Sequence, residues 1–92
     1  MTDEWRLLAN PSIVLREEFE DAALLFDPGT GEGFGLNPVG VFIWKRLDGI
    51  ATVSDVKSRV KSHFGNVPEG ADAQMSAFLE DLVAHGLAGY EV

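Results

Sequence analysis

The most informative stretch of this chain is FGLNPVGVFIWKRLDG, residues 34–49, in which a short apolar strand runs directly into an apolar helix. Asn37 follows the strand and can cap a helix with its side-chain oxygen, while Pro38 suits the first helical position. The apolar run that follows predicts a helix over residues 38–48. Gly49 then offers the left-handed conformation at which helices commonly stop.

Three short strands are predicted before this helix. Residues 12–16 are β-branched and alternate weakly, and residues 22–26 form a nearly continuous apolar run that indicates burial on both faces. A third strand covers residues 33–36. A charged turn at 17–21 and a glycine-rich turn at 27–32 join the strands, so the sequence predicts an antiparallel meander.

Two more helices are predicted after it. Thr52 can cap a helix that ends at Gly65, with Asp55 placed near the amides of its first turn. The third helix lies within residues 70–85 and has the clearest amphipathic stripe in the chain. The apolar residues of this stripe are Met75, Phe78, Leu79, Leu82 and Val83. A further short strand is expected within residues 87–92.

Strands followed by helices predict an α+β domain. The expected arrangement is winged-helix-like, a three-stranded antiparallel meander followed by three helices, of which the last two form a helix-turn-helix pair. The absence of repeats and long linkers indicates one domain over residues 1–92, with an N-terminal arm at 1–11 and a core at 12–88. A core of this size gives modest stability, and the sequence is compatible with a monomer or a homodimer.

The composition favours a cytoplasmic location. The chain has no cysteine, so it can form neither a disulfide nor a thiolate metal site. No basic start leads into an apolar run, as it would in a signal peptide. The apolar runs are also far shorter than the roughly 20 residues of a membrane helix. We therefore expect no membrane partner.

Charge is distributed unevenly along the chain, whose net charge is −8. Acidic ends flank a basic region, whose cations are Lys45, Arg46, Lys57, Arg59 and Lys61. These residues either dock an acidic partner, or compensate helix dipoles and aid solubility, and both readings stay open.

The charge of the third helix argues against DNA as a partner. In a helix-turn-helix pair this helix would read the DNA, yet it carries Asp72, Glu80 and Asp81 and no Lys or Arg. The phosphates of DNA would be repelled.

The sequence contains no convincing catalytic, metal or cofactor site. The glycines of residues 29–35 do not match the spacing of a phosphate loop and precede a strand instead of a helix. His63 and His85 lack a second ligand at metal-binding spacing. No serine lies in a nucleophile motif. We therefore expect no catalytic residue, no metal and no cofactor.

The third predicted strand is the positive candidate for a binding site. As the last strand of a meander it can leave one edge open, and unpaired backbone groups on such an edge can pair with an added peptide strand. The candidate residues on the strand are Gly33, Phe34, Gly35 and Leu36. The third helix can wall this groove with Gln74, Phe78, Asp81 and His85. Alternatively, residues 1–11 or a second subunit cover the edge, and Phe78 is an ordinary core residue.

The order and spacing of several short motifs resemble the PqqD-like family. The matching motifs are Leu15-Arg16, Leu24-Leu25, Leu36-Asn37, Asp48-Gly49, Thr52-Val53 with Asp55-Val56, Phe78-Leu79 with Leu82, and Gly86-Leu87. The resemblance covers about residues 11–88 and implies three strands followed by three helices, in agreement with the pattern of the residues.

The resemblance also implies a function. Members of the family recognise the leader of a ribosomally made precursor peptide, in the synthesis of pyrroloquinoline quinone or of other modified peptides. The leader would add as a strand to residues 33–36 against the third helix. The chain would then act as a non-enzymatic peptide chaperone and present the leader to a modifying enzyme, often a radical-SAM protein. The alternative is an acidic winged-helix module that binds a protein or, with less support, DNA.

Overall fold

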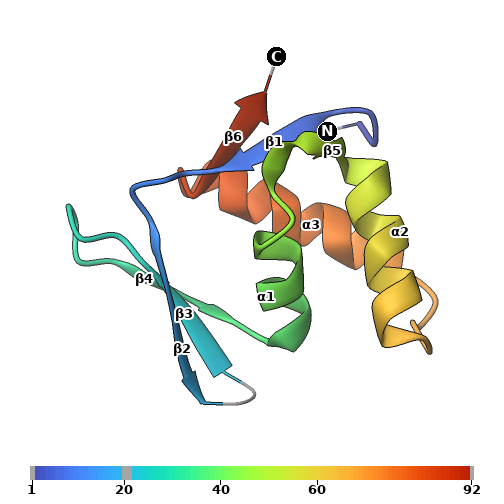
Figure 1. Cartoon of the computed structure of the whole chain (residues 1–92), viewed down its shortest axis with the longest axis horizontal. Coiled ribbons are helices and arrows are strands. Elements are labelled where there is room, and N and C mark those ends of the chain that lie inside the picture. The colour runs from blue at the N-terminus through green and yellow to red at the C-terminus, as the bar shows by residue number, and fades with distance from the viewer. Residues whose placement is uncertain (1, 20–21, 92) are drawn as a thin grey trace.

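The computed structural model describes residues 2–19 and 22–91. Within these residues the chain is a small α+β domain, with six short strands in two three-stranded antiparallel sheets and three helices (Figure 1). In chain order the elements are β1 (Arg6–Ala9), β2 (Val14–Phe19), β3 (Ala22–Phe26), β4 (Gly33–Leu36), α1 (Pro38–Trp44), β5 (Asp48–Thr52), α2 (Val53–Phe64), α3 (Ala71–Ala84) and β6 (Ala88–Glu91).

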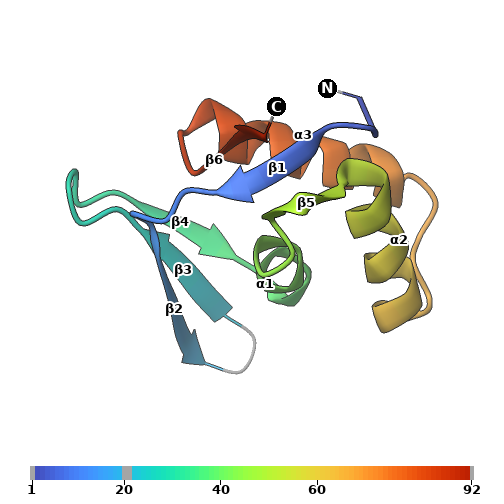
Figure 2. The ribbon, with the colours of Figure 1, turned by 45° about the horizontal axis from the view of Figure 1, so that its top comes forward.

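The predicted meander is confirmed. β2, β3 and β4 pair antiparallel in that order and project to one side of the helices (Figure 2). The second and third strands have the expected bounds, but the first begins at Val14 and continues to Phe19. Glu17 pairs with Ala23 in this longer ladder, so the charged turn predicted from residue 17 onward is partly wrong. Residues 20 and 21 of that turn lie outside the described residues.

The second sheet has the order β5-β1-β6. Of its three strands, the sequence predicted only β6. β1 lies at its centre and pairs antiparallel with both neighbours, so part of the expected N-terminal arm is a core strand. Leu7 on β1 is only 1% exposed. Segments from the start, middle and end of the chain therefore meet in this sheet.

The predicted first helix is too long. α1 ends at Trp44, and β5 begins at Asp48, where a helix end was expected. The Asp48 carboxylate accepts the N–H groups of Ile50 and Ala51 at 2.9 and 3.0 Å, and Gly49 has a φ of 78°. This turn directs the chain into β5, because β1 offers an edge with which the segment can pair.

The other predicted helix caps are confirmed. Asn37 Oδ1 accepts the N–H of Gly40 at 2.8 Å and thereby caps α1. Thr52 and Asp55 form a reciprocal capping box at the start of α2. At the end of α3, Gly86 has a φ of 72°, and the N–H of Leu87 donates to the carbonyl of Leu82 at 2.8 Å. This is a Schellman motif, in which the residue after the glycine folds back on the last turn.

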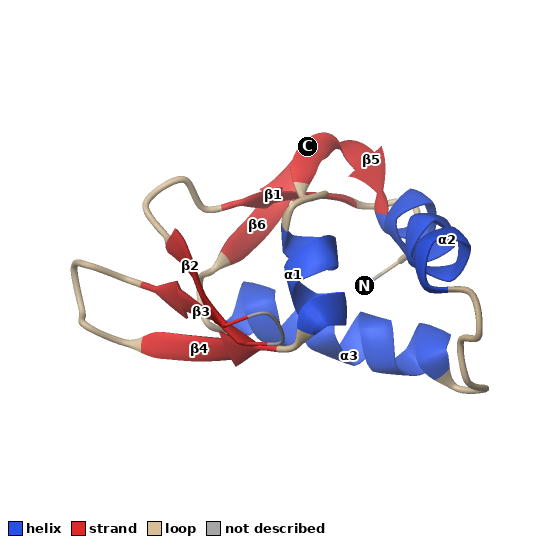
Figure 3. Cartoon of the chain, turned by 60° about the horizontal axis from the view of Figure 1, so that its bottom comes forward, coloured by secondary structure: helices blue, strands red, loops and turns tan. Residues whose placement is uncertain are grey.

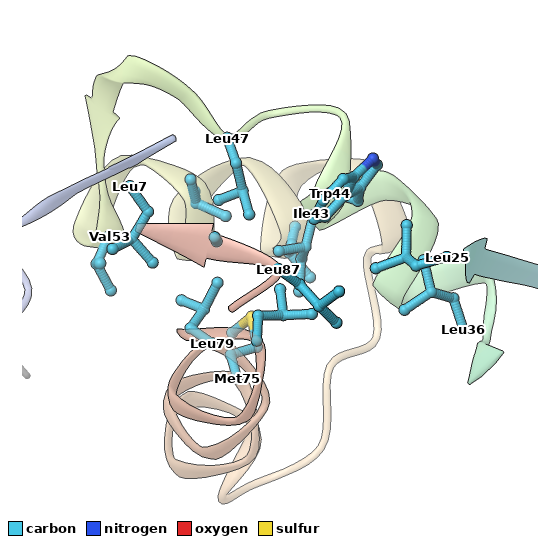
Figure 4. Packing of buried hydrophobic residues seen from close by; sticks show 14 of the residues in the cluster. Leu7, Leu25, Leu36, Ile43, Trp44, Leu47, Val53, Met75, Leu79 and Leu87 are labelled. Atoms are coloured by element: carbon cyan, nitrogen blue, oxygen red, sulfur yellow. The ribbon is translucent and has the colours of Figure 1, made fainter. Parts of the chain in front are cut away.

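One cluster of buried apolar residues joins both sheets to the three helices (Figure 4). The labelled members in Figure 4 are Leu7, Leu25, Leu36, Ile43, Trp44, Leu47, Val53, Met75, Leu79 and Leu87. The stripe predicted on α3 supplies its lower wall, although Phe78 and Val83 are only partly buried. In the described residues no helix combines the length and apolar character needed to span a membrane.

We expect the stability of the fold to decline at low pH through three aspartates. Hydrogen bonds from the backbone of Ala51 and then Ile50 lower the pKa of Asp48 below its ordinary value of 3.8. Hydrogen bonds from Thr52 lower the pKa of Asp55, and a hydrogen bond from Lys61 lowers that of Asp72. These pKa values are depressed in the folded state. The three aspartates therefore contribute to folding stability above pH 3.8, and this contribution is lost as the pH falls through their folded-state pKa values.

Thermal unfolding of the chain and of Asp48→Asn, followed by circular dichroism between about pH 6 and pH 3, checks this expectation. The Asn variant retains an oxygen acceptor but does not titrate, so its midpoint should decline less steeply below 3.8 than that of the parent chain. Equal declines for both proteins would show that Asp48 does not contribute to the pH dependence.

Candidate functional site

The free edge of β4 presents the backbone of two glycines. Opposed residues in an antiparallel pair alternate between hydrogen-bonded and non-hydrogen-bonded positions. The N–H of Asp27 donates to the carbonyl of Glu32 at 3.0 Å, so this pair is hydrogen-bonded. The Leu25–Phe34 pair lies two positions further along the register, so it is also a hydrogen-bonded pair. The pairs on either side of it, which contain Gly33 and Gly35, are non-hydrogen-bonded pairs. Gly33 and Gly35 consequently direct their N–H and C=O groups away from β3.

Nothing in the described part of the chain pairs with this edge, since β4 has β3 as its only strand neighbour. Residues 6–9, which were a candidate cover, lie in the other sheet. The side-chain positions of the two glycines differ: a Cβ at Gly35 would have no atom within 4 Å, whereas a Cβ at Gly33 would lie 2.9 Å from Leu24 Cδ1.

The opposite edge of the same sheet is protected. β2 carries the exposed charged residues Arg16, Glu17 and Glu18, and charges on an edge strand discourage pairing with another chain. Arg16 and Glu18 lie 3.4 Å apart as an ion pair, and Glu17 contacts Lys45 on the α1 side at 3.2 Å. Of the two outer strands, β4 is therefore the one suited to accept a strand.

Aromatic side chains connect β4 to α3. The Phe34 ring lies 5.4 Å from the His85 ring and 6.4 Å from the Phe78 ring, measured between centroids. His85 is the residue just after α3, and its Nδ1 lies 2.7 Å from the carbonyl of Asp81. The C-terminal half of α3 therefore forms a wall beside β4, and Figure 3 shows this helix running past the end of that strand.

An apolar hollow of about 490 Å³ lies where β4 passes into α1. It is lined by residues of α1, the end of α2, the α2–α3 loop and α3: Asn37, Val39, Gly40, Ile43, Val60, Phe64, Asn66, Val67, Pro68, Ala71, Gln74, Met75 and Phe78. Phe78 contacts Phe34 and also lines this hollow, so the wall and the hollow are continuous.

Most of the predicted groove residues therefore lie together. Phe34 lies against both Phe78 and His85, and Gln74, one helical turn from Phe78, lines the hollow. Leu36 is buried in the core and is a support for β4. The side chain of Asp81 is exposed, and its carbonyl accepts the backbone N–H of His85 at 3.0 Å.

The sequence reasoning missed the hollow, which is built from segments far apart in the chain. Gly40 is the one local signal for it. This glycine is buried in a helix, where a Cβ would lie 3.3 Å from Phe78 Cζ and 3.2 Å from Leu36 Cδ2. A glycine inside a helix is unfavourable unless packing requires it.

The five cations of the basic region do not act as one patch. Lys57 is buried and bonds Asp3 at 2.9 Å, and Lys61 bonds Asp72 at 2.8 Å. Lys45 contacts Glu17, as described above. Among residues 2–19 and 22–91, Arg46 and Arg59 form no ion pair.

The two histidines lie in different places, His63 stacked on Phe42 and His85 against Phe34. The part of the chain that the structure describes contains no group of three or more His, Cys, Asp or Glu side chains that could hold a metal ion. The geometry offers a strand edge, an aromatic wall and an apolar hollow, which are features of a site that binds a peptide.

Comparison with known proteins decides the family. The family model for coenzyme PQQ synthesis protein D (PqqD) matches residues 22–88, which include β3, β4 and all three helices. The chain belongs to the PqqD family. No curated protein sequence matches the chain significantly.

A solved structure supports the same fold for this PqqD-family chain. TbiB1, determined in complex with the TbiA(beta) leader peptide, aligns with a TM-score of 0.70 at 21% identity. The alignment covers 88% of this chain and 93% of TbiB1. The match therefore extends beyond the family region to nearly the whole fold.

Proposed function

We propose that this PqqD-family chain binds the leader of a ribosomally made precursor peptide by strand addition at β4. The observation that carries the proposal is the open edge on which the outward backbone groups belong to Gly33 and Gly35. The similar fold of TbiB1, which was solved with a leader peptide, supports it.

The proposed groove combines two kinds of contact. Main-chain hydrogen bonds to Gly33 and Gly35 supply affinity that does not depend on the leader's sequence, and side-chain contacts supply selectivity. Phe34, Phe78 and His85 form the wall against which every second side chain of the leader packs. Gln74 and Asp81 offer polar contacts on the same helix.

The hollow beside Phe78 is the place for an apolar side chain of the leader. Most of its lining is apolar, with Asn37, Asn66 and Gln74 as polar groups. Its volume is within the range of roughly 300–1,000 Å³ typical of ligand sites. An apolar residue at one end of the added strand would thus anchor the leader.

We further propose that the chain acts without catalysing a reaction and presents the leader to a modifying enzyme in the cytoplasm. The proposed enzyme acts in the synthesis of pyrroloquinoline quinone or of another modified peptide, and the proposed partner is a radical-SAM protein. The description of the matching family as coenzyme PQQ synthesis protein D supports the first of these pathways. The 92 residues would form a single recognition domain of winged-helix-like shape.

DNA binding is the weaker alternative. The acids of α3 would face the phosphates, and two of the three α2 cations already bond Asp3 and Asp72. A DNA complex would weaken steeply as salt rises, whereas strand addition would respond mildly. Titration at two salt concentrations therefore separates these two functions.

The first test is affinity capture with the tagged full chain from its native cell, followed by mass spectrometry of small peptides and proteins. We expect one short precursor peptide to be retained together with a modifying enzyme. A parallel capture with Gly35→Pro as bait should lose the peptide. Recovery of nucleic acid or an unrelated protein, with no peptide, would contradict the proposed function.

A further inference from the structure

The outer face of α1 and α2 carries a second, separate surface. A hollow of about 420 Å³ is lined by Phe42, Arg46, Ser58, Arg59, Ser62 and His63. These residues come from α1, the turn after it and α2, and none comes from β4 or α3. We call them the cationic hollow.

The lining of the cationic hollow is rich in hydrogen-bond donors. Two guanidinium groups, two hydroxyl groups and an imidazole surround it, and no carboxylate lines it. This composition is unusual for a chain of net charge −8, in which acidic side chains outnumber basic ones by 15 to 7. The surface therefore has the opposite sign to most of the molecule.

The guanidinium of Arg46 is stacked on an aromatic ring. Its guanidinium carbon lies 3.8 Å from the centroid of the Phe42 ring, and that ring also stacks on His63 at 4.5 Å. Stacking on an aromatic face restrains the guanidinium while leaving its N–H donors free at the edge of its plane. A carboxylate can accept two such parallel hydrogen bonds.

Arg59 is also available. Hydrogen bonds are the main cause of the lowered pKa of Asp48 and of Asp55, and the positive charge of Arg59 lowers both further. Their oxygens, however, accept backbone N–H groups at their own turns. Within the described residues Arg59 therefore has electrostatic neighbours but no ion pair.

We propose that the cationic hollow docks an Asp- or Glu-rich segment of a protein partner. A carboxylate of that segment bonds the stacked Arg46, a second reaches Arg59, and Ser58 and Ser62 donate to the same oxygens. Because the hollow shares no residue with the β4 groove, such a partner and a peptide can be bound at once, and the proposal does not depend on the peptide function.

A hexaglutamate peptide is the probe for this surface. In a nuclear magnetic resonance titration of the full chain, we expect amide shifts around Arg46, Arg59 and His63, and none at Gly33 or Gly35. Arg46→Gln with Arg59→Gln should weaken binding about fivefold or more, since charge-assisted hydrogen bonds are lost. The matched control, Lys45→Gln with Lys61→Gln, removes the same charge from paired lysines and should change affinity less than about twofold.

Four outcomes would overturn the proposal. If both double variants bind the hexaglutamate peptide equally weakly, the peptide is attracted only by the net charge of the protein. Amide shifts confined to β4 and α3 would mean that the peptide binds elsewhere. An absence of binding would mean that the cationic hollow does not dock an acidic segment. Competition by equimolar inorganic phosphate would identify a phosphate site instead. Thermal unfolding shows that both double variants remain folded, with a small decrease in midpoint where Lys61→Gln removes the bond to Asp72.

Discussion

Gly35→Pro is expected to abolish binding of the precursor peptide while leaving the domain folded. The N–H of Gly35 points away from β3, so its loss removes no hydrogen bond from the sheet. The same N–H would donate to a carbonyl of the added peptide strand. Proline lacks this N–H and places its ring where the peptide would approach. Gly35 has no positive φ, so proline does not require a reversed backbone.

The expected loss of affinity is at least about tenfold, because a backbone hydrogen bond contributes about 0.5–1.5 kcal/mol and the ring also excludes the peptide. The measurement is calorimetric titration with the peptide recovered by affinity capture. Circular dichroism and thermal unfolding of the variant should match the parent chain.

The matched control is Gly35→Ala. An alanine Cβ at this position would meet no atom within 4 Å, and the N–H is retained, so binding should change little. Phe34→Pro is unsuitable, because the N–H of Phe34 belongs to the ladder with Leu25 and its loss would damage the sheet. Normal binding by a folded Gly35→Pro variant would refute strand addition at β4.

Leu79→Ala is expected to be strongly destabilising. Leu79 is 0% exposed and lies on the inner face of α3, where the helix supports the core (Figure 4). Truncation of a fully buried leucine leaves a cavity and typically costs about 2–5 kcal/mol. A domain of this size has only about 5–15 kcal/mol in total, so the variant should be close to unfolding.

Urea unfolding followed by circular dichroism measures this loss of free energy. Ile50→Ala is the control, since Ile50 is 77% exposed on β5 and a surface truncation usually changes stability by less than about 0.5 kcal/mol. Similar effects for the two variants would mean that α3 does not form the wall of the core. A destabilised Leu79→Ala should also bind peptide less well, because α3 positions Phe78 and His85.

Local signals account for the features that the sequence predicts well. Asn37, Thr52 and Gly86 mark helix ends through hydrogen bonds that span only a few residues. The glycines of the 27–32 turn and the apolar pairing of 22–26 with 33–36 are likewise close in sequence. The meander, the caps and the stripe of α3 could therefore be read from the residues alone.

Long-range pairing explains the errors. The segment 48–52 has a helix-stop signal in Asp48 and Gly49, but its strand character arises from pairing with β1, about forty residues earlier. β1 itself has no clear period and becomes a strand because β5 and β6 flank it. The basic region likewise loses three of its cations to acids that only folding brings near: Asp3, Glu17 and Asp72.

The sequence by itself determined the three-stranded meander, the helix caps at Asn37, Thr52 and Gly86, and the choice of residues 33–36 as the candidate strand, since short-range hydrogen bonds and side-chain periodicity act within each segment. Only the tertiary structure decided that no strand within residues 2–19 and 22–91 pairs with the outer edge of this strand. Residues 6–9 could have covered it, but they pair with β5 and β6 instead. The same long-range packing brings Phe78 and His85 to Phe34, because such contacts form only when distant segments share one core.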